Sequence, residues 1–524
     1  MPHSLSMPLL RELCFAFVAG APVAAPAGAA SASAQDAIGG PESRSPPVIA
    51  IVDVTLLPMD REGALPHVTV ITRGAAIVAI GPTSGDGAVA LPAGATRIDG
   101  AGRWLLPGLI DNHVHCLDPR DLVLHLAHGV TTVRNLKGAP WHLELREAIR
   151  RGERIGPTFL TAGPFLNEPQ FRTPEQFESE ARRQADAGYD CLKMHGDLAE
   201  EAYERLFITA EELGLPLVGH VPRNLPLKTV LEIGPMAEIS HAEELVYTHF
   251  QPLRTEGDAR AIPGCIELLK AAGTALTPTL VAFENIAPQV EDLAAVLASP
   301  AAQLLPPAAR ELFGPRINHY VRRFRREDCA WLRSSREFQA RIVKAAHAAG
   351  VPVLLGTDCG IPVVVPGVAA AKELENLVGA GLSPWEALAA ATVRNGDFLQ
   401  QSPPIGRIAV GATADLLLLD ADPLADIAAV RRVAGVMSRG RWFGRQELDQ
   451  LLAARAASFA PETALAPLIA VDSTKALLTA VRALPRAADG RRPLDDAFLF
   501  SIWQVYLNAN LPHLAAEVLA CIEE

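Results

Sequence analysis

The 524-residue sequence has few basic residues for its size and no long run of them. Its 47 Lys and Arg residues are outnumbered by 59 Asp and Glu residues, which gives a formal net charge of −12. Because nucleic-acid phosphates require a basic surface, this balance argues against nucleic acid as a partner. Aromatic residues are also sparse, at 5% of the chain, and no stacked aromatic motif offers another way to bind nucleic acid.

Cysteine is scarce too, with seven residues in the whole chain. That number is too small for disulfides to hold a protein of this size together. Gly and Pro are frequent, at 40 and 42, but they follow no fixed period, which argues against collagen-like and repeat architectures. Hydrophobic residues at 49% and charged residues at 20% are typical of a globular protein, and the length predicts two or more domains.

Long hydrophobic runs are missing except near the N-terminus. Arg11 precedes an uncharged, Ala-rich stretch over residues 13–30, and Ala32-Ser33-Ala34 has the small-x-small pattern of a cleavage site. A membrane anchor is the alternative, but two prolines interrupt the stretch and its apolar part is short for a span. We therefore expect residues 1–34 to be a signal peptide and the mature protein to be periplasmic or secreted, without stable membrane insertion.

Short β-rich segments flank a long middle region. A polar linker is expected over residues 35–46, and β-rich segments separated by Gly, Pro and Asp then occur within 47–105 and again within 401–445. Two such segments on either side of a long insertion predict one small β-sandwich built from both flanks.

The middle region, residues 106–400, alternates strands and helices. The expected strands are 105–110, 129–133, 158–162, 191–194, 217–220, 237–240, 275–280 and 351–356. Eight strands interleaved with helices over this length predict an α/β fold with a (β/α)₈ TIM barrel. Residues 446–524 are rich in Ala and Leu and predict a helical C-terminal extension, with helices over 472–484 and 494–521. We expect this extension to pack on the barrel, while a homo-oligomer contact and partner binding stay open.

The strongest local motif is Pro107-Gly108-Leu109-Ile110-Asp111-Asn112-His113-Val114-His115. Histidines two residues apart at the end of a strand point to the same side. Neutral imidazoles there can hold one metal ion. A lone His-x-His pair is often incidental, but its position at the first strand–helix junction of the predicted barrel favours a site.

Four more polar residues end later strands of the predicted barrel. They are Lys193, His220, His241 and Asp358. Each has an ordinary interpretation, as a solvated lysine, a hydrogen-bonded structural histidine or a helix-capping aspartate. Because a barrel brings the C-terminal ends of its strands to one face, all of these residues are expected to converge with His113 and His115.

These motifs together resemble the amidohydrolase superfamily, in particular its prolidase-like and imidazolonepropionase-like branch. The resemblance runs over about residues 48–445 and rests on the 107–115 motif, on Gly-Val-Thr-Thr-Val-Arg at 129–134, and on Gly-Arg-Ile at 406–408 and Gly-Ala-Thr-Ala-Asp-Leu at 411–416. It implies a metal-dependent hydrolase that cleaves a carbon–nitrogen bond in an amide, peptide or cyclic amide.

The resemblance also implies two divalent metal ions, for which we expect Zn²⁺. His113 and His115 would bind the more buried ion together with Asp358, and His220 and His241 would bind the second. Lys193 would be N6-carboxylysine and would bridge both ions. A metal-bridging hydroxide would attack the substrate carbonyl carbon, Asp358 would move the proton, and His241 would help to orient the substrate.

The sequence departs from many prolidase-like members in the loops that face the substrate. Met194-His195-Gly196-Asp197 follows Lys193, and Val221-Pro222-Arg223 follows His220. Prolidase specificity is therefore open, and dipeptides, N-acyl compounds and cyclic amides all fit as small-molecule substrates. Five residues are possible pocket residues, each weighed against ordinary packing: His195, Tyr203, Arg223, Tyr247 and Glu284.

Two other functions stay open at this point. A mononuclear deaminase or ring hydrolase of the same superfamily needs fewer ligands, and Lys193 would be unnecessary. A catalytically inactive, secreted binding protein would use the barrel alone. Cys116 and Cys359 each directly follow an expected ligand, on strands expected to be neighbours, so a disulfide between them is a further alternative.

Overall fold

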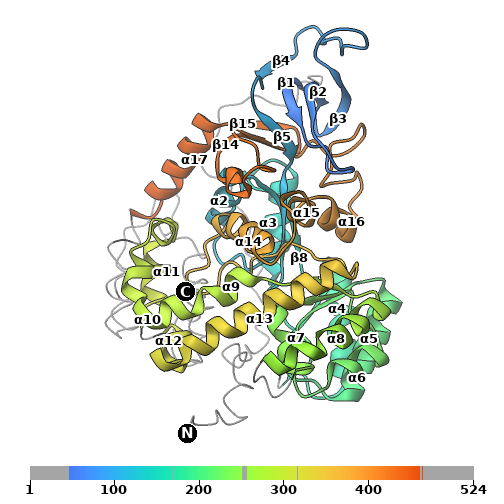
Figure 1. Ribbon diagram of the computed structural model, residues 1–524, viewed down its shortest axis with the longest axis vertical. Coiled ribbons are helices and arrows are strands. Elements are labelled where there is room, and N and C mark those ends of the chain that lie inside the picture. The colour runs from blue at the N-terminus through green and yellow to red at the C-terminus, as the bar shows by residue number, and fades with distance from the viewer. Residues whose placement is uncertain are drawn as a thin grey trace.

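Figure 1 shows the computed structural model, which describes residues 46–460 apart from 169, 251–255 and 316, together with the isolated residues 463 and 479. The expected signal peptide, nearly all of the linker and the helices expected over 472–484 and 494–521 lie outside the described residues, except for residue 479. Within the described part of the chain, no helix has the length and apolar character needed to span a bilayer.

The two flanks of the chain meet in one eight-stranded sheet at one end of the molecule (Figure 1). Along the sheet the strands run in the order β15-β14-β13-β5-β1-β2-β3, and β4 pairs with β1. The strands are β1 (Val48–Leu56), β2 (Leu65–Arg73), β3 (Ala76–Pro82), β4 (Thr96–Asp99), β5 (Trp104–Pro107), β13 (Leu416–Leu419), β14 (Val433–Ser438) and β15 (Arg441–Gly444). Segments more than 300 residues apart are thus joined, since β13 pairs antiparallel with β5.

This sheet differs from the two stacked sheets of a sandwich. A bridge between Ala76 and Thr413 joins its outer strand β3 to the segment that precedes β13. The sheet therefore curls over its own apolar core, in which Ile51, Val70 and Leu418 are buried. One curled sheet and two stacked sheets are both built from short apolar strands that cover a core, so the two arrangements look alike in sequence.

The middle region contains two parallel sheets. One has the order β6-β7-β8 and the other β12-β11-β10-β9. Their strands are β6 (Leu109–Val114), β7 (Val130–Asn135), β8 (Thr158–Thr161), β9 (Leu192–Met194), β10 (Leu217–Gly219), β11 (Glu238–Ser240) and β12 (Ala275–Thr277). Seven of the eight strands expected for the barrel are therefore present, with bounds that differ from the predicted ones by at most four residues.

The eighth expected strand, over 351–356, is reduced to isolated bridges. Val353 bridges Leu276 of β12, and Cys359 bridges Val114 of β6. A further bridge, between Ala162 and Cys191, links the two parallel sheets. The described strands thus follow one another in a ring, but they do not form a single closed sheet.

Helices surround the parallel strands, with α4, α5, α6 and α8 together on one side (Figure 1). The α-helices are α2 (Leu122–Ala127), α3 (Pro140–Arg150), α4 (Pro174–Ala187), α5 (Glu200–Leu213), α6 (Leu227–Ile233), α7 (Ala242–Thr248), α8 (Ile262–Ala272), α9 (Leu280–Glu284), α10 (Ile286–Leu297), α11 (Pro307–Leu312), α12 (His319–Arg323), α13 (Cys329–Ala348), α14 (Val368–Gly379), α15 (Pro384–Ala390), α16 (Val393–Leu399) and α17 (Arg445–Ala457). The short 3₁₀ helices are η2 (Pro119–Asp121), η3 (Glu256–Ala261), η4 (Ala302–Leu304), η5 (Arg326–Asp328) and η6 (Ile427–Arg431).

The described part of the C-terminal extension packs on the body of the protein through α17. Its Arg455 is buried and pairs with the carboxylate of Asp121. The same guanidinium donates to the backbone carbonyls of Arg120 and Leu304, at 3.1 and 2.7 Å. Three hydrogen-bonding partners from two other segments fix this helix in place.

Asp415 lies at the junction between the sheet and the parallel strands, and its buried carboxyl group is expected to make stability depend on pH. Its Oδ1 accepts from the Arg439 backbone N–H at 2.6 Å, whereas Oδ2 is buried without a hydrogen-bond partner among the described residues. Burial raises the pKa of Asp415 from 3.8 to about 6. The folded protein therefore binds this proton more tightly than the unfolded chain, and ionisation of Asp415 lowers stability as the pH rises through this window.

We expect Asp415→Asn to raise the melting temperature at about pH 7.5, because the variant has no carboxylate to ionise, and to have little effect near pH 4. Thermal unfolding followed by circular dichroism at both pH values measures the two differences. An equal difference at both would show that the charge of Asp415 is not responsible.

Candidate metal centre and pocket

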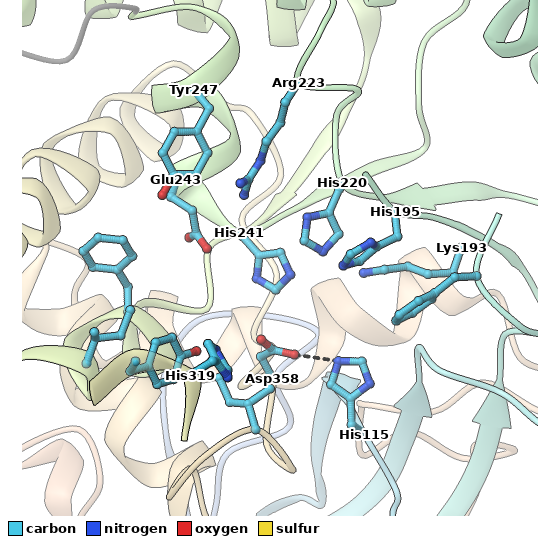
Figure 2. Close-up of a pocket in the computed structure, with 15 residues that line it drawn as sticks. His115, Lys193, His195, His220, Arg223, His241, Glu243, Tyr247, His319 and Asp358 are labelled. Carbon is cyan, nitrogen blue, oxygen red and sulfur yellow. Dashed lines mark ion pairs between the residues drawn. The ribbon is translucent and has the colours of Figure 1, made fainter. Parts of the chain in front are cut away.

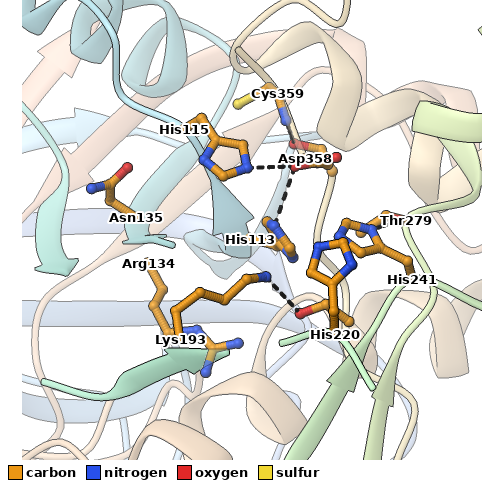
Figure 3. Close-up of polar contacts among 12 residues, drawn as sticks. His113, His115, Arg134, Asn135, Lys193, His220, His241, Thr279, Asp358 and Cys359 are labelled. Atoms are coloured by element: carbon orange, nitrogen blue, oxygen red, sulfur yellow. Dashed lines mark hydrogen bonds and ion pairs between the residues drawn. The ribbon is translucent and has the colours of Figure 1, made fainter. Parts of the chain in front are cut away.

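The residues predicted to form the site all lie at or beyond the ends of the parallel strands. His113 lies in β6 and Lys193 in β9, while His220 and His241 directly follow β10 and β11. Asp358 lies between Val353, which bridges β12, and Cys359, which bridges β6. Although these residues are spread over about half of the chain, the parallel topology brings them close together (Figure 3), and all of them except His113 line one cavity.

The backbone at these strand ends adopts unusual conformations. His241, Thr279 and Asp358 have positive φ angles of 71°, 47° and 58°. Such conformations are costly for residues with a side chain and gather at functional sites. Gly219 has a φ of 117°, and a Cβ there would lie 2.6 Å from Cδ of Lys193. Glycine at this position therefore leaves room for the Lys193 side chain.

His113, His115 and Asp358 form the tightest cluster in the site. Their ligand atoms lie within 4.8 Å of one another, and all three residues are buried. The Nε2 atoms of His113 and His115 lie 3.2 and 2.8 Å from Oδ1 of Asp358. Within the described part of the chain, both ring nitrogens of His113 and Oδ1 of Asp358 nevertheless lack a hydrogen bond of good geometry. Two imidazoles and a carboxylate, buried and aimed at one point, fit a divalent metal ion.

Lys193, His220 and His241 lie on the other side of His113 (Figure 3). The rings of His220 and His241 are 4.6 Å apart, and the His241 ring is also 4.6 Å from that of His113. Nζ of Lys193 donates to Oγ of Ser240 at 3.4 Å. All six predicted residues are thus gathered in one place, although the three-residue cluster alone has its ligand atoms within metal-binding distance of one another in the described part of the chain.

The charge states of these residues suit metal binding. Burial lowers the pKa of His113, His115, His220 and His241. These imidazoles are therefore neutral near pH 7, the form that ligates metals. Burial opposes ionisation of Asp358, but His241 and His115 outweigh it and lower its pKa to about 2. Burial also lowers the pKa of Lys193, to about 8.

Two partners that the sequence analysis missed orient the second pair of histidines. Nδ1 of His220 donates to Oε1 of Glu244 at 2.7 Å, and Nδ1 of His241 lies 2.7 Å from Oγ1 of Thr279. Glu244 comes three residues after His241 and Thr279 two residues after β12, but nothing in their local sequence distinguishes them from capping or turn residues.

Above this centre, Arg223, Glu243 and Tyr247 form one wall of the cavity (Figure 2). The Arg223 guanidinium donates to both oxygens of Glu244, with Nη2 2.6 Å from Oε1. It also stacks over the Tyr247 ring, 4.1 Å from the centroid. Burial and the neighbouring Glu244 raise the pKa of Glu243 to about 8. Too little positive charge lies near this carboxyl group to offset its burial, so its ionised form is disfavoured.

Apolar side chains line another part of the cavity. They come from α9, α10, α12 and the loop after Asp358, and they are Phe283, Ile286, Tyr320 and Ile361. His319 of α12 also faces the cavity, and burial lowers its pKa to about 4. The cavity therefore has a polar floor that fits metal ions, one charged wall and one apolar wall.

The five possible pocket residues divide into two groups. His195, Arg223 and Tyr247 line the cavity. Tyr203 is fully buried in the core and donates its hydroxyl to the carbonyl of Gly234 at 2.6 Å. Glu284 does not line the cavity, and its carboxylate lies 3.3 Å from Lys372.

The alternative of a disulfide between Cys116 and Cys359 is not realised. Both cysteines are buried free thiols, as are the other three in the described residues.

Solved structures with a similar fold include several hydrolases. One is a bottromycin amidohydrolase, at a TM-score of 0.63 and 24% identity, over 79% of this chain and 91% of that chain. A Xaa-Pro dipeptidase with methionine bound in its active site has a TM-score of 0.60 and 19% identity, over 76% of this chain and all of that chain. A molinate hydrolase has a TM-score of 0.59 and 20% identity, over 78% and 97%. At these identities the likeness is one of fold.

A search of curated proteins found no match. A sequence model of the amidohydrolase family, however, matches residues 104–443, which is more than half of the chain and includes every residue of the metal centre. Together with the convergent His, Lys and Asp residues, this match shows that the chain belongs to the amidohydrolase family.

Proposed function

We propose that this protein is a binuclear metal-dependent hydrolase that cleaves carbon–nitrogen bonds in amides, peptides or cyclic amides. The observation that carries the proposal is the convergence of six residues suited to two metal ions. His115, Lys193, His220, His241 and Asp358 line one cavity, and His113 contacts Asp358 and the His241 ring. Imidazole and carboxylate ligands suit Zn²⁺, which we propose for both ions.

The ligands divide as the family resemblance implies. His113, His115 and Asp358 would hold one ion, His220 and His241 the other, and a carboxylated Lys193 would bridge the two. When bound, such a pair of ions supplies an activated hydroxide at neutral pH and polarises the scissile carbonyl group.

The chain's own residues have three tasks around that centre. Asp358 is anionic and next to His115, so it can accept a proton and later deliver it to the leaving nitrogen. Glu244 and Thr279 fix the ring orientations of His220 and His241. His241, whose ring lies beside the charged wall of the pocket, would help to orient the substrate (Figure 2).

The site also supports a closed (β/α)₈ barrel as the underlying architecture. The bridges Ala162–Cys191, Leu276–Val353 and Val114–Cys359 link successive strands around the ring, and Leu355 donates its backbone N–H to the carbonyl of Ala390 while its own carbonyl accepts from Asn112. Active sites of such barrels lie at the C-terminal ends of the strands, which is where these ligands are. The secreted or periplasmic location remains a proposal from the N-terminal sequence alone.

The first test is the metal content of protein purified without chelators and with bicarbonate present. We expect about two metal ions per chain, and a sharp fall in Lys193→Ala. Lys228→Ala, which changes an exposed lysine on α6, is the matched control. One ion per chain, unchanged in Lys193→Ala, would favour the mononuclear alternative. No bound metal, even after zinc is supplied, would favour the inactive binding protein.

A second prediction concerns Glu244, the partner of His220. We expect Glu244→Ala to weaken zinc binding by roughly 10- to 100-fold, because it removes the acceptor that fixes the His220 ring. Glu244→Gln retains an acceptor oxygen and should lose less. Competition titration with a zinc-binding dye measures both, and Glu204→Gln, on the exposed face of α5, is the control. Equal zinc affinity in all three variants would show that Glu244 does not contribute to metal binding.

A further inference from the structure

Glu243 is an acidic pocket residue to which the metal centre assigns no role. Its side chain extends from the start of α7 into the cavity, on the side opposite His115 (Figure 2). Oε2 of Glu243 is buried and has no hydrogen-bond partner among the described residues. A buried carboxylate oxygen without a donor is costly unless a ligand supplies one.

The neighbouring charges favour a cation as that ligand. Glu243 and Glu244 are adjacent in α7, and Arg223 is the cation of this wall. The guanidinium is already engaged, since it donates to both oxygens of Glu244 and stacks on Tyr247. The two carboxyl groups thus have one cation between them, and an ammonium group of a ligand would supply the positive charge that an ionised Glu243 lacks.

The charged residues around the cavity also make it unsuitable for a carboxylate group of the substrate at this wall. Among the described residues that line the cavity, the permanent cation is Arg223, which is held by Glu244. His319 is neutral near pH 7, because burial lowers its pKa. Lys193 lies on the floor, at the proposed metal centre, and not at the wall.

The apolar wall indicates which kind of side chain the substrate carries. Phe283, Ile286, Tyr320 and Ile361 offer a surface for an aromatic or aliphatic group. A molecule that holds an amide carbonyl at the floor, an ammonium group at Glu243 and an apolar group at this wall would meet all three surfaces of the cavity.

We propose that Glu243 is a specificity residue that binds the free α-ammonium group of the substrate, and that the substrates are α-amino amides with an apolar side chain. The inference rests on the proposed hydrolase function, since the floor must hold the carbonyl group. Glu243 accepts hydrogen bonds from the ammonium group, and no covalent step is involved.

The test uses two metal-chelating ligands that differ only in the amine: L-phenylalanine hydroxamate and 3-phenylpropanohydroxamate. Isothermal titration calorimetry with the zinc-loaded protein gives both affinities. We expect the wild type to bind the amine-bearing ligand roughly 10- to 100-fold more tightly, the value of a buried hydrogen bond to a charged group. In Glu243→Gln, which preserves the shape of the side chain, this ratio should fall to near one. Glu204→Gln is again the control.

The outcomes distinguish a wrong assignment of Glu243 from a wrong proposal of metal-dependent hydrolase function. If both hydroxamates bind but their ratio is the same in wild type and Glu243→Gln, the assignment of Glu243 is wrong while the metal-dependent function stands. If neither hydroxamate binds to zinc-treated protein, the proposed function fails, and the role of Glu243 fails with it.

Discussion

Asp358→Asn is expected to lower kcat/KM for any hydrolysed amide by about 10²–10⁴-fold, the usual contribution of a positioned acid–base group. The carboxylate of Asp358 is the anionic member of the tightest cluster and lies 2.8 Å from Nε2 of His115. An amide at this position can neither accept the proton nor return it to the leaving nitrogen. The left-handed backbone at residue 358, with φ of 58°, suits Asn as well as Asp, so we expect the fold to be retained.

Three measurements on Asp358→Asn separate chemistry from structure. The kinetic constants report the chemical step, elemental analysis reports the metal content, and circular dichroism reports the fold. Asp449→Asn, which changes an exposed aspartate on α17, controls for loss of a carboxylate elsewhere. Undiminished kcat/KM in a metal-loaded Asp358→Asn variant would exclude Asp358 as the proton-transfer residue.

Glu238→Ala is expected to lower the free energy of unfolding by about 3–5 kcal/mol, because it leaves a buried guanidinium without its counter-charge. Glu238 of β11 is fully buried, and its Oε2 accepts from Nη2 of Arg134 at 2.7 Å. Its Oε1 accepts from the hydroxyl of Ser240, which in turn accepts from Nζ of Lys193. Removal of Glu238 therefore also loosens the contact that positions Lys193.

Urea unfolding of Glu238→Ala, compared with the double variant Arg134→Met/Glu238→Met, tests the cause. We expect the double variant to recover most of the lost stability, because it removes both charges and keeps apolar volume. Glu212→Ala, which breaks an exposed ion pair with Arg182, should have little effect. A double variant as unstable as Glu238→Ala would mean that lost packing, and not an unpaired charge, destabilises the protein.

The sequence alone predicted the strand-end residues that the structure brings together in the candidate metal centre. His113 and His115 form a recognisable motif because two residues along a strand return a side chain to the same face. Lys193, His220, His241 and Asp358 were predictable because each follows a short apolar segment, and parallel strands present their C-terminal ends on one face. Strand positions followed from the same local patterns, with bounds that differ by a few residues.

Only the tertiary structure identified what surrounds that centre. Glu244 and Thr279 orient His220 and His241 across 24 and 38 residues of sequence, and such contacts leave no periodic trace in a chain. Tyr203 and Tyr247 have similar sequence surroundings, yet one is in the core and the other in the cavity. Local sequence determines which residues end a strand, because a strand is formed by consecutive residues of the chain. The packing of distant helices determines which side chain faces a cavity, and so Glu243 became a candidate only after the walls of that cavity were known.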